Sequence, residues 1–131
     1  MTDSPAIMRS MLGRARGLGS AKSGTGHWWA QRVTAVALIP LVLWFVAALV
    51  ALTGADRSTV VAWLREPFPA IVTVLLLIAG LYHMSLGIQV VIEDYIHNEA
   101  TKISAIVLNK LVAFAIAAAG IFAVLRIAFQ G

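Results

Sequence analysis

The segment PFPAIVTVLLLIAGLYHMSLGIQVVI, residues 67–92, decides the fold of this chain. It contains no Asp, Glu, Lys or Arg, and its only titratable side chains are those of Tyr82 and His83. A helix needs about 20 predominantly apolar residues to cross about 30 Å of hydrocarbon, because each residue adds about 1.5 Å. The segment meets this requirement and therefore predicts a membrane-spanning helix.

Two further apolar segments lie on either side of this one. Residues 33–53 hold no ionisable group, and a membrane helix tolerates their Pro40 because neighbouring groups can satisfy the freed carbonyl. Residues 103–129 carry Lys110 and Arg126 near their two ends, so that both side chains can reach an interface. The predicted fold class is an all-α integral membrane protein with three transmembrane helices.

The composition supports this fold class and excludes several kinds of site. Of the 131 residues, 60% are hydrophobic and 12% are charged, whereas a soluble domain has about 25% charged residues. A soluble globule is therefore excluded. The chain has no cysteine, which excludes disulfides, thiolate-bound zinc, iron–sulfur ligation and covalently attached haem for this polypeptide alone.

The distribution of charge predicts the orientation in the membrane. Three spans place the N-terminal arm, residues 1–32, on the same side as the loop at 93–102, and the link at 54–66 on the other. The basic residues expected on the first side are Arg9, Arg14, Arg16, Lys22, Arg32, Lys102 and Lys110, whereas those on the second are Arg57, Arg65 and Arg126. The excess predicts a cytoplasmic arm and loop and a periplasmic link. Because topology and anionic lipid explain the positive charge, nucleic acid is not an expected partner.

Two of these polar segments allow a second interpretation. The arm is rich in Arg and poor in acids, like a mitochondrial presequence, but its glycines would break the amphipathic helix that such a signal needs. In the link, residues 58–64 are compatible with a short interfacial helix anchored by Trp63 and equally with a surface turn.

His83 is the most informative residue for function. It lies about 16 Å along a helix from Asp94, so that it falls near the bilayer midplane if Asp94 is at the interface. Gly80, Gly87 and Asp94 lie within about 60° of His83 around the helix, which leaves the imidazole between two residues without side chains. A buried imidazole of this kind can ligate haem iron, hydrogen-bond another helix or take part in a proton pathway.

A haem with two axial histidines would need a ligand from another polypeptide. His27 and His97 are the only other histidines, and both lie outside the predicted spans. Asp94 and Tyr95 follow directly after the second span, where a phenol can donate a hydrogen bond to the carbonyl of a membrane-dissolved quinone. Taken alone, Tyr95 at this position is more often a simple interface anchor, and Asp94 is also compatible with a solvated helix end.

The segment HMSLGIQVVIEDY, from His83 to Tyr95, resembles the His-x(10)-Asp-Tyr signature of the hydrophobic membrane anchors of succinate dehydrogenase, respiratory complex II. GHWWAQRVTA, from Gly26 to Ala35, is similar to the entry to the first helix of the same family. The length, the three-span layout and the cytoplasmic N-terminus also resemble those of its bacterial members. The resemblance implies that the three helices form half of a heterodimeric anchor bundle.

The resemblance also implies roles for particular residues. His83 would be one axial ligand of a haem b shared with the large cytochrome b anchor subunit. Tyr95 and Asp94 would bind ubiquinone, Arg32 and His27 would lie near the quinone pocket or the haem propionates, and Gly80 and Gly87 would face the haem. The flavoprotein and iron–sulfur subunits, which carry FAD and the iron–sulfur clusters, would be held on the cytoplasmic face of the bacterial inner membrane. The chain itself would be a non-catalytic anchor.

Two other functions remain compatible with the sequence. The anchor of a quinol:fumarate reductase has the same architecture and supports the reverse reaction. In a small non-redox membrane protein, His83 and Asp94 would form part of a proton path. This last alternative leaves the two glycines beside His83 unexplained.

Overall fold

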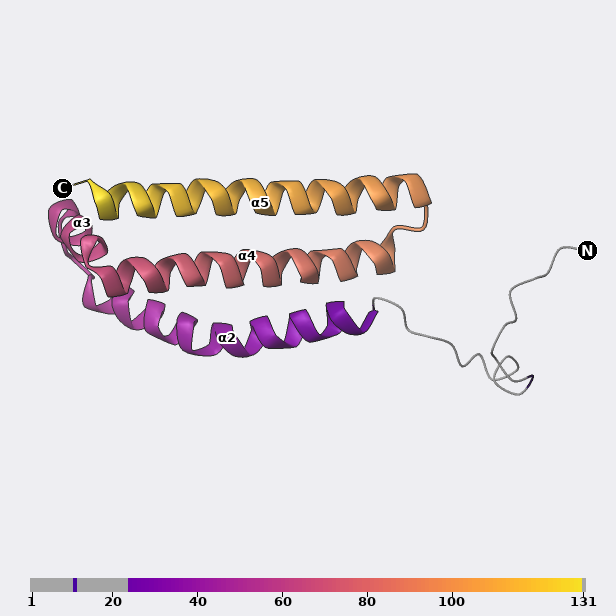
Figure 1. The fold of residues 1–131 in the computed structure, drawn as a ribbon, viewed down its shortest axis with the longest axis horizontal. Coiled ribbons are helices and arrows are strands. Elements are labelled where there is room, and N and C mark those ends of the chain that lie inside the picture. The colour runs from indigo at the N-terminus through magenta and orange to yellow at the C-terminus, as the bar shows by residue number, and fades with distance from the viewer. Residues whose placement is uncertain (1–10, 12–23, 131) are drawn as a thin grey trace, which may run out of the picture.

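The computed structural model describes residue 11 and residues 24–130, and these residues form an all-helical protein (Figure 1). The helices are α2 (Gly24–Ala51), α3 (Arg57–Arg65), α4 (Pro67–Tyr95) and α5 (Glu99–Phe129). The segments Thr25–Ala51, Pro67–Tyr95 and Glu99–Phe129 are each long and apolar enough to cross a membrane. The fold class predicted from the three apolar segments is therefore confirmed.

Helix α4 lies between α2 and α5 and packs against both, as Figure 1 shows. Within the described residues, α2 and α5 do not contact each other. Successive long helices run in opposite directions, so the start of α2, the end of α4 and the start of α5 lie at the same end of the molecule. This arrangement brings His27, Arg32 and Tyr95 to one end.

Most large apolar side chains face outward. Val36 is 67% exposed, Phe114 is 74% exposed and Phe122 is 68% exposed, while the buried apolar side chains include Leu86 and Val124. A soluble monomer rarely exposes apolar surface on this scale. The outer surface of the three long helices therefore suits lipid or the helices of another subunit.

The start of the first long helix differs from the sequence expectation. We expected an arm over residues 1–32 and a span from 33, but α2 begins at Gly24, so residues 24–32 are helical. The uncharged apolar segment begins at Val33, whereas the helix already begins at Gly24. The start of the apolar segment therefore does not coincide with the start of the helix. Four basic residues of the predicted arm lie outside the described residues, namely Arg9, Arg14, Arg16 and Lys22. Most of the segment that was compared with a mitochondrial presequence also lies outside them.

The loop between the second and third spans is also shorter than expected. We expected a loop over 93–102, but α4 continues to Tyr95 and α5 starts at Glu99. Asn98 caps α5, since its side-chain oxygen accepts a hydrogen bond from the backbone N–H of Thr101 at 3.1 Å. Lys102 and Glu99 form an ion pair at 2.9 Å in the first turn. The charged residues thus belong to helix ends, because a helix can extend beyond the hydrocarbon.

The link between the first and second spans contains the short helix that the sequence allowed. Gly54 has a φ of 80°, which favours glycine, and it lets the chain turn after α2. Asp56 caps α3 by accepting a hydrogen bond from the backbone N–H of Thr59 at 3.0 Å. Trp63 of α3 stacks on Trp44 of α2 with ring centroids 5.7 Å apart. This contact holds α3 against the end of the first long helix.

Candidate functional site

His83 lies on α4, where it is half-buried, and it faces α2. Its Nδ1 atom lies 3.0 Å from the hydroxyl oxygen of Thr34. The same hydroxyl lies 2.7 Å from the carbonyl oxygen of Ala30 and 3.1 Å from that of Gln31, one turn earlier in α2. One ring nitrogen of His83 is therefore engaged inside the chain, and Nε2 is the atom left for another partner.

The two glycines beside His83 lie on the same side of α4. A Cβ atom at Gly80 would lie 3.9 Å from Cδ2 of Leu38, and one at Gly87 would lie 3.8 Å from Nε2 of Gln31. Both neighbours belong to α2. The shared face that the helical periodicity predicted is therefore present and packs against α2, and a role of these glycines beside haem stays a prediction.

A row of polar side chains on α2 faces the same contact. His27, Gln31 and Thr34 follow the i, i+4, i+7 spacing that places residues on one helix face. Among the described residues, Nε2 of His27 and Oε1 of Gln31 are buried without a hydrogen-bond partner. Buried polar atoms of this kind normally have partners. The unpaired atoms thus fit a ligand or another subunit at this end of α2.

Gln31 and Thr34 were missed by the sequence analysis. The sequence analysis assigned roles near the start of the first span to His27 and Arg32 only, although Gln31 lies between them and Thr34 follows two residues after Arg32. Their spacing from His27 was the available signal, because it continues one polar face into an otherwise apolar helix. A prediction that considered partners for His83 from within the chain could have used it.

Arg32 lies on the exposed side of the same part of α2. Its guanidinium carbon lies 4.3 Å from the centre of the Trp28 ring, which is a cation–π geometry. Within the described part of the chain, no carboxylate pairs with Arg32. Its charge is therefore available to an anionic group, while the indole holds the stem of the side chain in place.

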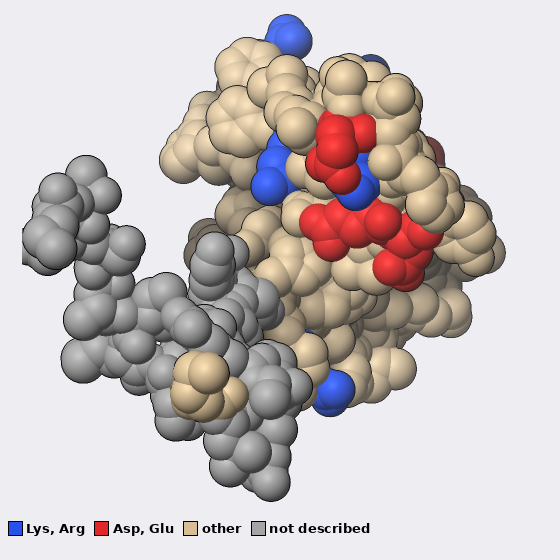
Figure 2. Space-filling model, turned by 90° about the vertical axis from the view of Figure 1, so that its right-hand side faces the viewer, with Lys and Arg blue, Asp and Glu red and all other residues tan. Residues whose placement is uncertain are grey.

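The end of α4 carries the second group of candidate residues. Tyr95 is 78% exposed, and Asp94 is exposed beside it. Glu93 accepts a hydrogen bond from the side chain of Gln89 at 2.8 Å. Figure 2 shows Asp and Glu gathered on the end of the molecule where α4 and α5 meet. The exposed acidic residues of these two helix ends are Glu93, Asp94 and Glu99.

The charge at the end of α4 is unusual for a helix. Its last turn has no basic residue but contains Asp94, although the negative end of the helix dipole favours cations. No described basic group pairs with Asp94. This carboxylate is therefore placed to receive a cation or a hydrogen-bond donor from outside the chain. His97 lies in the short loop and is exposed.

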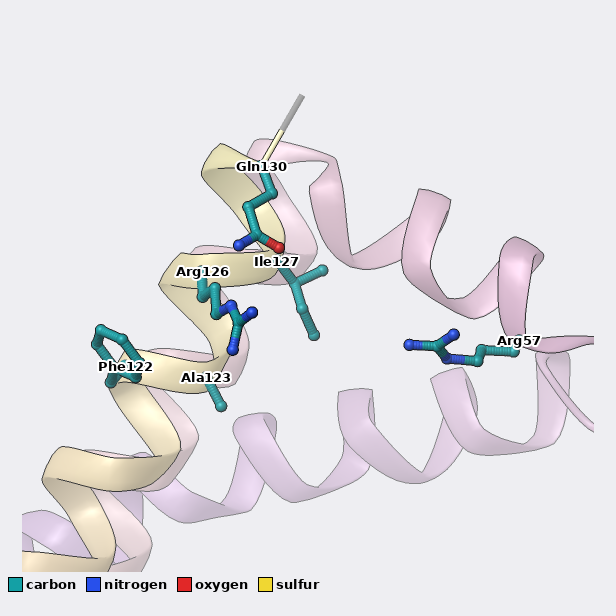
Figure 3. Close-up of a pocket in the computed structure, with 6 residues that line it drawn as sticks. All are labelled: Arg57, Phe122, Ala123, Arg126, Ile127 and Gln130. Carbon is teal, nitrogen blue, oxygen red and sulfur yellow. The ribbon is translucent and has the colours of Figure 1, made fainter.

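A surface pocket at the opposite end of the molecule contains none of the predicted site residues. Its volume is about 360 Å³, and Figure 3 shows Arg126 and Gln130 of α5 on one side and Arg57 of α3 on the other. The remaining lining residues are Phe122, Ala123 and Ile127. Because the pocket lies at the far end of α5 from Glu99, it is separate from the polar end of α4.

The donor atoms of this site limit how it can hold a metal. Over the described residues, no three side chains of His, Cys, Asp or Glu come together as a metal cluster. His83 is instead a single imidazole inside an apolar helix, which suits the axial ligation of a haem iron. Such a site would be completed by a ligand outside this chain.

The fold and the site define a class of protein, namely a small three-span membrane protein with an imidazole inside its second span. The chain matches over residues 7–122 the family described as "Succinate dehydrogenase/Fumarate reductase transmembrane subunit", and it belongs to this family. The resemblance found in the two motifs is therefore confirmed.

Several curated relatives carry a more specific name. The chain is 37% identical to the succinate dehydrogenase hydrophobic membrane anchor subunit of Paracoccus denitrificans, with 86% of each chain covered. It is 38% identical to the anchor subunit of the same name from Rickettsia bellii, over 79% of this chain and 82% of the relative. For the Rickettsia conorii subunit of the same name the identity is 34%, over 75% of this chain and 79% of the relative.

Proposed function

We propose how this membrane anchor subunit of succinate dehydrogenase takes part in electron transfer: His83 supplies one axial ligand to a haem b. The observation that carries the proposal is the half-buried imidazole inside the second span, with Nδ1 engaged by Thr34 and Nε2 available. The other axial ligand comes from the large cytochrome b anchor subunit. Membership of a family of succinate dehydrogenase and fumarate reductase transmembrane subunits supports this proposal. In it, the two anchors together form one helical bundle.

The other residues near the start of α2 fit the same group. A haem carries two anionic propionates, and when bound it supplies a one-electron carrier within the membrane. The guanidinium of Arg32 has no carboxylate partner among the described residues, and the buried Nε2 atom of His27 is unpaired. We assign both side chains to the binding of the propionates or of the neighbouring quinone. Gly80 and Gly87 would then lie beside the haem.

We further propose that Tyr95 and Asp94 form this chain's part of a ubiquinone site. The phenol of Tyr95 donates a hydrogen bond to a quinone carbonyl, because its hydroxyl is exposed at the end of a membrane helix. Asp94 orients a basic group of a partner subunit, which would also offset the unfavourable charge at the end of α4. Donation to the carbonyl stabilises the negative charge that develops on its oxygen during reduction.

The orientation follows from the charge bias of the sequence. The N-terminal arm, the start of α2 and the end of α4 face the cytoplasm of a bacterial cell, and α3 faces the periplasm. The iron–sulfur and flavoprotein subunits then dock at the end that bears Tyr95, so that electrons from succinate reach the quinone over a short distance. The apolar outer surface contacts membrane lipid and the large anchor subunit.

Purification of the complex through a tag on this chain tests the proposal. The measurements are the dithionite-reduced minus oxidised absorption spectrum and the identification of every co-purifying subunit. We expect a b-type spectrum together with a flavoprotein, an iron–sulfur protein and a second anchor. The same partners without haem would refute the role of His83 and leave the anchor function in place. A small non-redox protein would show neither haem nor these partners.

A further inference from the structure

We propose that Thr34 is a positioning residue for His83, holding the imidazole in the tautomer that carries its proton on Nδ1. The proposal rests on the proposed ligation of haem by His83. It goes further by naming the residue that prepares Nε2 for the iron. Thr34 lies within the segment GHWWAQRVTA, but no role follows for it from that resemblance. Its role is inferred from the contact between α2 and α4.

The geometry around the Thr34 hydroxyl determines the tautomer. Its oxygen lies 2.7 Å from the carbonyl oxygen of Ala30 and 3.0 Å from Nδ1 of His83. The carbonyl can only accept, so the single hydroxyl proton satisfies this contact only by pointing at Ala30. The hydroxyl oxygen then accepts from an N–H at Nδ1 of His83. With the other tautomer the hydroxyl would donate to Nδ1 and leave the oxygen pair at 2.7 Å without a proton.

The first arrangement makes two hydrogen bonds, and the second makes one. Each hydrogen bond stabilises the contact modestly, and a buried group left without its partner destabilises it by more. Both Thr34 and His83 are at least half-buried in the contact between the helices. The tautomer with the proton on Nδ1 is therefore favoured, and the lone pair resides on Nε2, where a metal can bind.

The two glycines beside His83 leave only small groups on this face of α4. A Cβ atom at Gly80 or at Gly87 would lie in ordinary contact with the end of a flexible α2 side chain, at 3.9 Å and 3.8 Å respectively. Helix α2 therefore packs directly on the face of α4 where Thr34 contacts His83.

A hydrogen bond from Nδ1 has a consequence for a metal at Nε2. A ligating histidine that donates its other N–H is fixed in orientation and is a more basic ligand, and removing the acceptor typically weakens metal binding by about 10- to 100-fold. A more basic imidazole stabilises ferric iron relative to ferrous iron. Loss of the Thr34 hydroxyl should therefore raise the midpoint potential of the haem and weaken its retention.

The test compares purified complexes that carry Thr34→Val, Thr34→Ser or Thr73→Val. Valine matches the shape of threonine without the hydroxyl, and serine keeps the hydroxyl. Thr73 is the matched control, because it is a threonine of a membrane helix whose buried hydroxyl has no partner among the described residues. Redox titration gives the midpoint potential, and transfer of haem to an apo-haem protein gives its retention.

We expect Thr34→Val to shift the potential to more positive values and to release haem about tenfold more readily, while Thr34→Ser and Thr73→Val resemble the wild type. If Thr34→Val does not assemble, Thr34→Ala provides the same comparison with less volume. Unchanged potential and haem retention without the hydroxyl would overturn the inference. An equal shift in Thr34→Ser would also overturn it, because shape and not hydrogen bonding would then be responsible.

The His83→Ala and Thr34→Val variants together separate ligation of haem by His83 from the positioning role of Thr34. A complex with His83→Ala that keeps its haem would refute the ligation itself. Loss of haem with His83→Ala, together with unchanged haem properties with Thr34→Val, would support His83 as the ligand and refute only the role of Thr34.

Discussion

The side-chain amide of Asn109 on α5 donates a hydrogen bond to the backbone carbonyl of Ser85 on α4 at 2.8 Å, and it lies 3.2 Å from the Ser85 hydroxyl. Ser85 is buried and follows His83 by two residues. The contact joins the second and third spans close to the candidate haem ligand. Thr34 contacts His83 from the other side, so this part of α4 is held by hydrogen bonds from both neighbouring helices.

Replacement of Asn109 by Leu should loosen the contact between α4 and α5. Hydrogen bonds between membrane helices contribute about 0.6 kcal/mol on average and up to about 1.7 kcal/mol. We expect a lower midpoint for thermal dissociation of the detergent-solubilised complex. Ser85→Ala is the control, because it removes the contact of Asn109 with the Ser85 hydroxyl at 3.2 Å and keeps the carbonyl acceptor at 2.8 Å. If both variants are as stable as the wild type, this contact does not stabilise the bundle.

Gly120 should tolerate only small side chains. A Cβ atom there would lie 3.1 Å from Cδ1 of Leu77, which is tighter than ordinary contact. Gly120→Val should therefore destabilise the packing of α5 on α4 by about 1 to 3 kcal/mol, the usual cost of overpacking. Combining it with Leu77→Ala should recover part of this loss in the same thermal assay. If Leu77→Ala does not raise the dissociation midpoint of the Gly120→Val complex, the contact with Leu77 is not the cause of the destabilisation.

Tyr95→Phe should impair quinone reduction without removing haem. The substitution deletes only the phenolic hydroxyl, and the loss of one hydrogen bond corresponds to about a 3- to 10-fold decrease in rate. The measurement is succinate-dependent reduction of a soluble ubiquinone analogue, with the haem spectrum recorded on the same sample. Tyr82→Phe is the control, since Tyr82 lies one position before His83 in the interior of α4. Normal activity with Tyr95→Phe would reduce Tyr95 to an interface anchor.

The cap of α3 should persist in acid. Hydrogen bonds from Ser58, and then from Thr59, lower the pKa of Asp56 from 3.8 to about 2. A carboxyl group whose pKa is lower in the folded state stabilises that state above its unfolded pKa, and the stabilisation is lost as the pH falls towards 2. Asp56 therefore stays ionised in the folded state down to about pH 4, and its cap should protect the amides of α3 from hydrogen exchange over this range.

Substitution of the cap distinguishes this effect from general acid damage. Asp56→Ala should speed amide exchange at the start of α3 at neutral pH, whereas Asp56→Asn should not, because asparagine is also a favourable cap. Equal exchange in all three proteins would show that the cap does not stabilise the helix.

The fold was predictable because uncharged apolar segments long enough to cross a membrane have few alternatives. The helix ends were less predictable, since α2 starts at Gly24 and α5 at Glu99, and polar residues at an interface do not interrupt a helix. Hydrophobicity determines which part of a helix lies in lipid. Local capping, as by Asn98, determines where the helix begins.

Helical periodicity was sufficient to predict part of the geometry of the candidate site. The spacing of Gly80, His83 and Gly87 placed them on one face, and this face packs against α2. Predicting Thr34 as the partner of His83 requires knowledge of how α2 and α4 are aligned along their axes. The amino-acid sequences of the two helices do not specify this alignment. The link between Asn109 and Ser85 was missed for the same reason.

The central claim, that His83 ligates haem b, is tested most directly by the haem content of the purified complex. The measurement is the reduced minus oxidised spectrum, normalised to the flavoprotein subunit, for His83→Ala and for His97→Ala. His97 is an exposed loop histidine and serves as the matched control. We predict that the first substitution abolishes or strongly lowers the haem signal and that the second leaves it unchanged. A full haem signal with His83→Ala would contradict the account.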